Sequence, residues 1–189
     1  MASQTSPRPA GPAGRGGLFR LGEAVELLER TPGALRALVG GLSEPWLAAN
    51  EGPATFDTGD VLCHLIYGEE TDWIPRIRII LEQGESRPFT PFDRHGGKRL
   101  RHRPPAELLD TLARLRAENL RALAGFALSE ADLARRGTHP ALGPVTLAQY
   151  IAAWTVHDLG HLAQITRILA RRYAAAVGPL REYLTIVKL

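Results

Sequence analysis

The stretch from residue 147 to residue 168 constrains the fold more than any other part of the sequence. Its apolar residues recur at steps of three and four, which predicts one long amphipathic helix with this stripe turned toward a core. The stripe consists of Leu147, Tyr150, Trp154, His157, His161, Ile165 and Ile168. Two histidines are therefore expected on the buried face of one helix, one turn apart.

Two imidazoles one turn apart can reach the same point, which is how a helix presents ligands to a transition metal. A buried imidazole needs partners for its ring nitrogens, so His157 and His161 are expected to hydrogen-bond to neighbours or to bind a metal. We favour the metal, because a third candidate histidine lies elsewhere in the chain. Imidazole accepts several divalent metals. We expect zinc or nickel first, with iron as an alternative.

The third candidate, His64, lies near the start of another predicted helix. Residues 57–60 offer N-cap chemistry for a helix that runs to about Gln83 and bends at Pro75. Residues 61–67 are apolar on all sides except at His64, which is typical of a buried helix. The helical wheel does not place His64 on the later apolar stripe of this helix. Three histidines without a carboxylate or thiolate ligand would leave a fourth coordination position open, as in catalytic sites.

Two further helical patterns complete the predicted fold. A heptad-like series covers residues 21–42, and Pro32 either caps a second helix within it or kinks a single one. The pair Pro104-Pro105 opens a helix that reaches about Gly125. Four long helical patterns without a convincing alternating strand predict an all-α four-helix bundle, and the long connections argue against a simple up-down arrangement.

The connection at residues 84–105 concentrates basic side chains. It holds Arg94, His95, Lys98, Arg99, Arg101, His102 and Arg103. Loops of this length are often functional. We expect either a solvated basic loop or an anion-binding rim for an acidic substrate, and its two histidines are poor ligand candidates.

Residues 1–17 are rich in Pro, Gly, Ser and Arg and lack apolar periodicity, which predicts a disordered tail before a single domain at residues 18–189. Three of the 23 basic residues, Arg8, Arg15 and Arg20, precede the first acidic one, so the rest of the chain balances 20 acidic residues with 20 basic ones. This neutral body gives no support for a nucleic-acid partner.

The single cysteine, Cys63, can form no intramolecular disulfide, which is compatible with a reducing cytoplasm. It is expected to be a small buried hydrophobe, because adjacent helix residues point ~100° apart and it cannot share the direction of His64. No apolar run is long enough to span a bilayer, and the N-terminus has no apolar signal core. We therefore expect a cytoplasmic protein without a membrane partner. We also expect a homodimer.

Together these features resemble the DinB/YfiT-like superfamily, a set of four-helix proteins with metal-dependent members, over residues 21–173. The resemblance rests on Thr31-Pro32 with Leu35, Asp60 to Leu65, Glu69, Asp72-Trp73, His139-Pro140, Gly143 to Leu147 and His157-Asp158-Leu159-Gly160-His161. In that family the second helix gives one histidine and the last helix two, which implies His64, His157 and His161 as metal ligands. The chain departs from many members at Phe56, where they have tryptophan, and the connection that directly follows Gly84 matches no family motif.

The resemblance leaves the reaction open, because family activities range from transfer and isomerisation with low-molecular-weight thiols to no known activity. A three-imidazole site activates a nucleophile, and no nearby cysteine or serine is placed to be one, so we expect water or a small thiol cosubstrate. Our first hypothesis is a metal-dependent transferase that moves a low-molecular-weight thiol to a small electrophile. The alternatives are a hydrolase of a small amide or ester and a non-catalytic, stress-related metal-binding module.

The segment from His157 to His161 is also similar to the zincin motif H-E-x-x-H, with Asp158 in place of the glutamate that acts as general base. Aspartate is one methylene shorter, and no histidine follows His161 to supply a downstream ligand. A protease is therefore disfavoured. Asp158 is a candidate catalytic base, with a helix-surface position or a role in orienting an imidazole as the alternatives.

Overall fold

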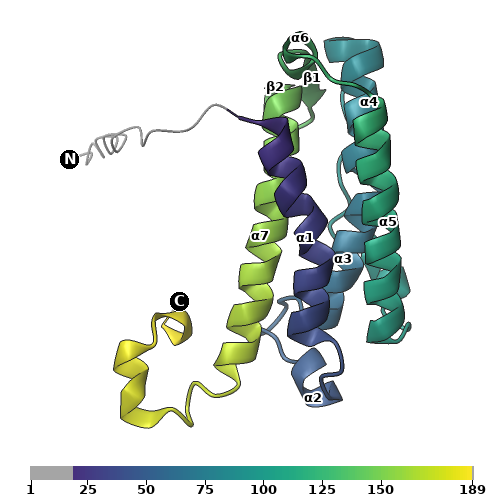
Figure 1. The fold of residues 1–189 in the computed structure, drawn as a ribbon. Helices are drawn as coiled ribbons and strands as arrows, with labels where there is room; N and C mark the ends of the chain where they lie inside the picture. The colour runs from purple at the N-terminus through teal and green to yellow at the C-terminus, as the bar shows by residue number, and fades with distance from the viewer. Residues whose placement is uncertain (1–18, 189) are drawn as a thin grey trace, which may run out of the picture.

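The computed structural model describes residues 19–188, so the predicted tail at residues 1–17 lies outside the described residues. The long helices are α1 (Leu21–Val39), α3 (Thr58–Thr71), α4 (Trp73–Gln83), α5 (Pro105–Gly125) and α7 (Leu147–Arg171). Figure 1 shows α7, α1 and α5 side by side, with α3 and its continuation α4 behind them. This arrangement confirms the predicted all-α four-helix bundle. None of the described helices is long and apolar enough to cross a membrane.

Shorter elements connect the long helices. They are α2 (Glu44–Leu47), α6 (Glu130–Leu133), β1 (Arg136–His139), β2 (Gly143–Thr146) and the 3-10 helices η1 (Gly84–Ser86), η2 (Gly96–Leu100), η3 (Gly178–Tyr183) and η4 (Thr185–Val187). The strands β1 and β2 pair antiparallel, with Arg136 opposite Thr146 and His139 opposite Gly143. The sequence did not predict this hairpin, because each strand has four residues and β2 contains Pro144, which removes one backbone donor.

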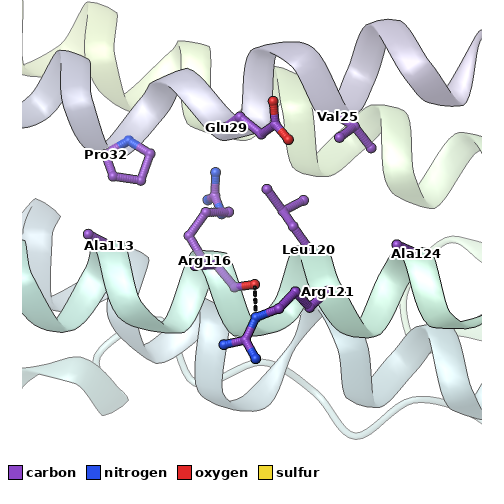
Figure 2. Close-up of a pocket in the computed structure, with 9 residues that line it drawn as sticks. Val25, Glu29, Pro32, Ala113, Arg116, Leu120, Arg121 and Ala124 are labelled. Carbon is purple, nitrogen blue, oxygen red and sulfur yellow. Dashed lines mark hydrogen bonds between the residues drawn. The ribbon is translucent and has the colours of Figure 1, made fainter.

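Pro32 lies inside α1, so the structure selects the single helix over two helices divided by a cap. Proline has no N–H, so the carbonyl oxygen of Leu28, four residues earlier, loses its usual helical partner. The Nη1 atom of Arg116 donates to this oxygen at 2.7 Å. Figure 2 shows the Arg116 side chain reaching from α5 toward Pro32 on α1. An arginine thus fills the hydrogen-bonding gap that the proline creates.

The helix predicted from Asp57 to about Gln83 is divided into α3 and α4. Asp57 caps α3, since its Oδ1 accepts from the backbone N–H of Asp60 at 2.7 Å. The helix stops at Thr71 because Pro75 has no N–H to donate to the Thr71 carbonyl. Asp72, with φ −111° and ψ −67°, separates the two helices. Pro75 therefore interrupts the helix as predicted, but the interruption lies at Asp72, before the proline.

Candidate metal centre

Helix α7 positions two of the three candidate histidines. It begins at a capping box in which Thr146 Oγ1 accepts from the Gln149 N–H at 3.1 Å and Gln149 Oε1 accepts from the Thr146 N–H at 2.9 Å. The predicted stripe faces the core, where Trp154 packs into one cluster of buried apolar side chains and Ile165 into another. The histidines lie on α7 between these two residues and are half-buried. Helix periodicity alone therefore locates them between the two halves of the core.

The three predicted histidines converge on one point. The Nε2 atom of His157 lies 3.1 Å from Nε2 of His64 and 3.1 Å from Nε2 of His161. One ring nitrogen from each of the three lies within 4.8 Å of the others. His64 reaches this point because α3 is buried around most of its circumference and ends at Thr71, so the later stripe on α4 does not determine its direction. The mismatch on the helical wheel disappears once the helix is divided.

Hydrogen bonds alone cannot satisfy the three converging nitrogens. A neutral imidazole nitrogen offers either one N–H or one lone pair. Nε2 of His157 can therefore bond to His64 or to His161, but not to both. Two nitrogens bound to one tetrahedral ion at 2.0–2.1 Å lie about 3.3 Å apart, which is close to the two short separations here. One divalent cation would accept all three lone pairs, so the donor set fits a metal.

The opposite ring nitrogens of two histidines hold their rings in orientation. Nδ1 of His64 donates to the backbone carbonyl oxygen of Arg94 at 3.3 Å, and Nδ1 of His161 donates to Oε1 of Gln164 at 2.9 Å. Because both acceptors are carbonyl oxygens, the proton resides on Nδ1 and the lone pair on Nε2. Nδ1 of His157 is buried and has no hydrogen-bond partner among the described residues. Two of the three imidazoles are thus fixed in the tautomer that a metal ligand requires.

The environment also keeps the imidazoles uncharged. Burial, and then the neighbouring His161, lowers the pKa of His64 to about 4. Burial, and then His161 and His64, lowers the pKa of His157 to about 3. Burial lowers the pKa of His161 as well. All three rings are neutral at pH 7, so they can bind a cation without first releasing protons.

Aromatic rings enclose the histidines. Trp73 packs edge-on against His157 at a ring separation of 5.3 Å, and Phe56 and Phe92 contact His64 at 5.6 and 5.4 Å. Trp154 is fully buried in the core and stacks on Trp73. These rings give the centre an apolar wall that limits the access of water.

Tyr150, on the same stripe of α7, lines a separate small cavity of about 220 Å³. Trp73 also lines this cavity, and the Tyr150 hydroxyl donates to the Asp72 carbonyl oxygen at 3.3 Å. The Trp73 ring contacts both Tyr150 and His157, so Tyr150 is one aromatic residue away from the histidines.

Asp158 occupies a buried position, so the alternative of a helix-surface residue is wrong. It is 1% exposed, and its Oδ2 accepts from Nη1 of Arg116 at 2.6 Å. Nη2 of Arg116 donates to Oε1 of Glu69 at 2.8 Å, and Asn119 donates to Oε2 at 2.9 Å. No hydrogen bond joins Asp158 to the three histidines within residues 19–188. Its carboxylate is engaged by a buried arginine, which counts against a role as a mobile catalytic base.

Sequence reasoning did not find Glu69 and Arg116 as partners of this carboxylate. The signal for Arg116 was its spacing, because it follows the buried Leu112 by four residues on α5. Glu69 shares a buried face of α3 with Leu62, Leu65 and Ile66. The spacing on one helix places each charge on a buried face, but it does not show which charge on another helix is its partner.

The other predicted candidates lie outside the centre. Cys63 is buried, and burial raises the pKa of its thiol to about 11, which agrees with a small buried hydrophobe. His95 and His102 are not members of the histidine group. In the basic loop, Arg99 forms an ion pair with Glu70 and Arg101 one with Asp57. Part of the predicted anion-binding rim is therefore used within the fold.

Comparison with known proteins adds a family and a fold. The family model of the DinB superfamily matches residues 27–165. No curated protein matches the chain. Among solved structures, YfiT from Bacillus subtilis, described as a probable metal-dependent hydrolase with an unusual four-helix bundle topology, is similar with a TM-score of 0.71 and 22% identity. The likeness covers 85% of this chain and 92% of that chain, and at this identity it shows a shared fold.

Proposed function

This chain belongs to the DinB superfamily, and from that membership and the geometry of the histidines we propose that His64, His157 and His161 bind one divalent transition metal. The observation that carries the proposal is the convergence of three Nε2 atoms, those of His64 and His161 unprotonated, in an arrangement that hydrogen bonds cannot satisfy. We expect zinc or nickel, with iron as the alternative, because all three accept imidazole ligands.

We further propose that the centre transfers a low-molecular-weight thiol to a small electrophile. A divalent ion with three neutral ligands supplies a Lewis acid that lowers the pKa of a bound water or thiol toward ~7. The described residues near the centre offer no nucleophile of their own, because the thiol of Cys63 is buried and its pKa is raised to about 11. The nucleophile must therefore arrive with a substrate. The aromatic rings of Trp73, Phe56 and Phe92 would then exclude competing water.

Hydrolysis of a small amide or ester is the second candidate function. The same three imidazoles would serve it, with water in place of the thiol, and the structurally similar YfiT is described as a probable metal-dependent hydrolase. We assign Asp158 an electrostatic role in either reaction in place of the general base predicted from the sequence, because Arg116 engages its carboxylate. A non-catalytic metal-binding module is the third candidate.

A paired assay separates these functions. Metal-loaded protein is expected to accelerate the substitution of the chloride of 1-chloro-2,4-dinitrobenzene by the thiol of cysteine, which forms the thioether and releases chloride and a proton. The His161→Ala variant is expected to lose roughly 100-fold of this rate because it loses one of three ligands. Hydrolysis of 4-nitrophenyl acetate is measured alongside. Faster ester cleavage without thiol transfer would favour the hydrolase, and no acceleration of either reaction would favour the binding module.

We also propose that the chain forms a homodimer through the face shared by α1 and α7. Leu27, Val156 and Leu159 on these helices are 44%, 66% and 45% exposed, and Leu27 and Val156 line the same surface groove. Exposed apolar groups that gather on one face mark interaction surfaces. The Val156→Glu variant is expected to be monomeric by light scattering at tens of micromolar. Leu142→Glu is the control, because Leu142 is equally apolar and exposed but lies in the hairpin turn. A monomeric wild type would contradict this proposal.

A further inference from the structure

Two arginines of the basic loop are engaged in ion pairs with the fold. Arg101 forms ion pairs with Asp57 at 2.7 Å and with Asp60 at 3.6 Å, and it stabilises the start of α3. Arg99 forms an ion pair with Glu70 on the same helix. These two guanidinium groups are committed to carboxylates of the fold. Arg94 is exposed, and no ion pair with a carboxylate is found for it in the described part of the chain.

Both ends of Arg94 lie against the histidine centre. Its backbone carbonyl oxygen accepts the hydrogen bond from Nδ1 of His64 at 3.3 Å. Its guanidinium carbon lies 5.0 Å from the centre of the Phe56 ring, and that ring lies 5.6 Å from the imidazole of His64. A guanidinium that rests on an aromatic face keeps the N–H groups at its edge available for an anion. Arg94 therefore presents unused donors at the edge of the centre.

The charge of Arg94 lies beside the centre, because the Phe56 ring against which its guanidinium packs also contacts the imidazole of His64. An ion held by three neutral imidazoles would add further positive charge at the same place. A ligand whose donor atom binds the metal ion and which carries a negative group nearby would be attracted by both the ion and the guanidinium of Arg94.

We propose that Arg94 is the specificity-determining residue of this centre and binds a carboxylate carried by the small thiol. Guanidinium groups match carboxylates in shape and charge, because two parallel N–H groups can donate to the two oxygens. This inference rests on the proposed metal-dependent thiol chemistry, and it adds the class of substrate: a small thiol with a carboxylate a few bonds from its sulfur.

A pair of thiols of equal length tests this assignment. The full-length protein is loaded with cobalt(II) and titrated with 3-mercaptopropionate and with 3-mercapto-1-propanol, which differ in the carboxylate, while the thiolate-to-cobalt absorption band is followed. The wild type is expected to bind the carboxylate thiol roughly tenfold more tightly. Arg94→Gln is expected to remove this preference, so that the two thiols bind with similar affinity. Lys98→Gln loses the same charge from the same loop and is expected to keep the preference.

Each other outcome refutes a different statement. Equal affinities of the wild type for the two thiols, or the same loss in Lys98→Gln, would overturn the role of Arg94 and leave the metal centre intact. A cobalt spectrum without a thiolate band for either thiol would refute the thiol reaction together with this inference. A protein that binds no cobalt would refute the centre itself.

Discussion

Replacing His157 by alanine is expected to reduce the bound metal from about one ion per chain to nearly none, with a loss of affinity of at least 100-fold. The Nε2 atom of His157 is the one that lies 3.1 Å from both other Nε2 atoms, so its removal leaves two donors from two different helices. Metal content after desalting, measured by mass spectrometry, gives the stoichiometry. Competition with a chromophoric chelator gives the affinity.

His95→Ala is the matched control for this experiment. It removes an imidazole from the same face of the protein, beside Phe56, but from a residue outside the converging group. Metal content should remain at the wild-type value. Retention of a full equivalent of metal by His157→Ala, or an equal loss in His95→Ala, would contradict the assignment of the ligands.

The second large effect is expected from Arg116→Met. One guanidinium joins four of the five long helices, because Arg116 on α5 donates to Glu69 on α3, Asp158 on α7 and the Leu28 carbonyl on α1. Its carbon also lies 5.1 Å from the Trp154 ring. Methionine fills similar volume but leaves two buried carboxylates without their cation. Breaking a buried ion pair in this way costs about 3–5 kcal/mol, which corresponds to a fall in Tm of roughly 10 °C.

Arg36→Met provides the comparison, since Arg36 pairs with Asp110 at 2.5 Å on the surface. The two side chains are 48% and 72% exposed, and solvent weakens such pairs to about 1 kcal/mol or less. Thermal and urea unfolding of both variants would measure the difference. Equal stability losses in the two variants would show that the buried network does not hold the helices together.

The helices could be predicted from the sequence because their signals are local. Helix α7 begins at Leu147 as predicted and includes the whole predicted stretch 147–168, because the capping box and the apolar period both lie within the segment. To predict where α3 ends, one must also consider that Pro75 has no N–H and that the Thr71 carbonyl therefore loses its helical hydrogen bond. The hairpin was missed because four-residue strands are too short to show an alternating pattern.

The site was predictable only in part. His157 and His161 follow from spacing on one helix, and His64 from its place as the polar exception in a buried helix together with the family resemblance. The environment of Asp158 could not be predicted, because Glu69 and Arg116 come from two other helices. These charged side chains can be buried because Arg116 forms ion pairs with both carboxylates. Long-range contacts of this kind require the packed bundle.

X-ray absorption at the metal edge of the zinc-loaded, full-length protein tests the central claim most directly. It counts the imidazole ligands, measures their distances and detects any sulfur. The arrangement of His64, His157 and His161 predicts three imidazole nitrogens at about 2.0 to 2.1 Å and one further light atom in an open fourth position. Fewer than three imidazoles, or a fourth ligand from the protein that closes the site, would contradict it.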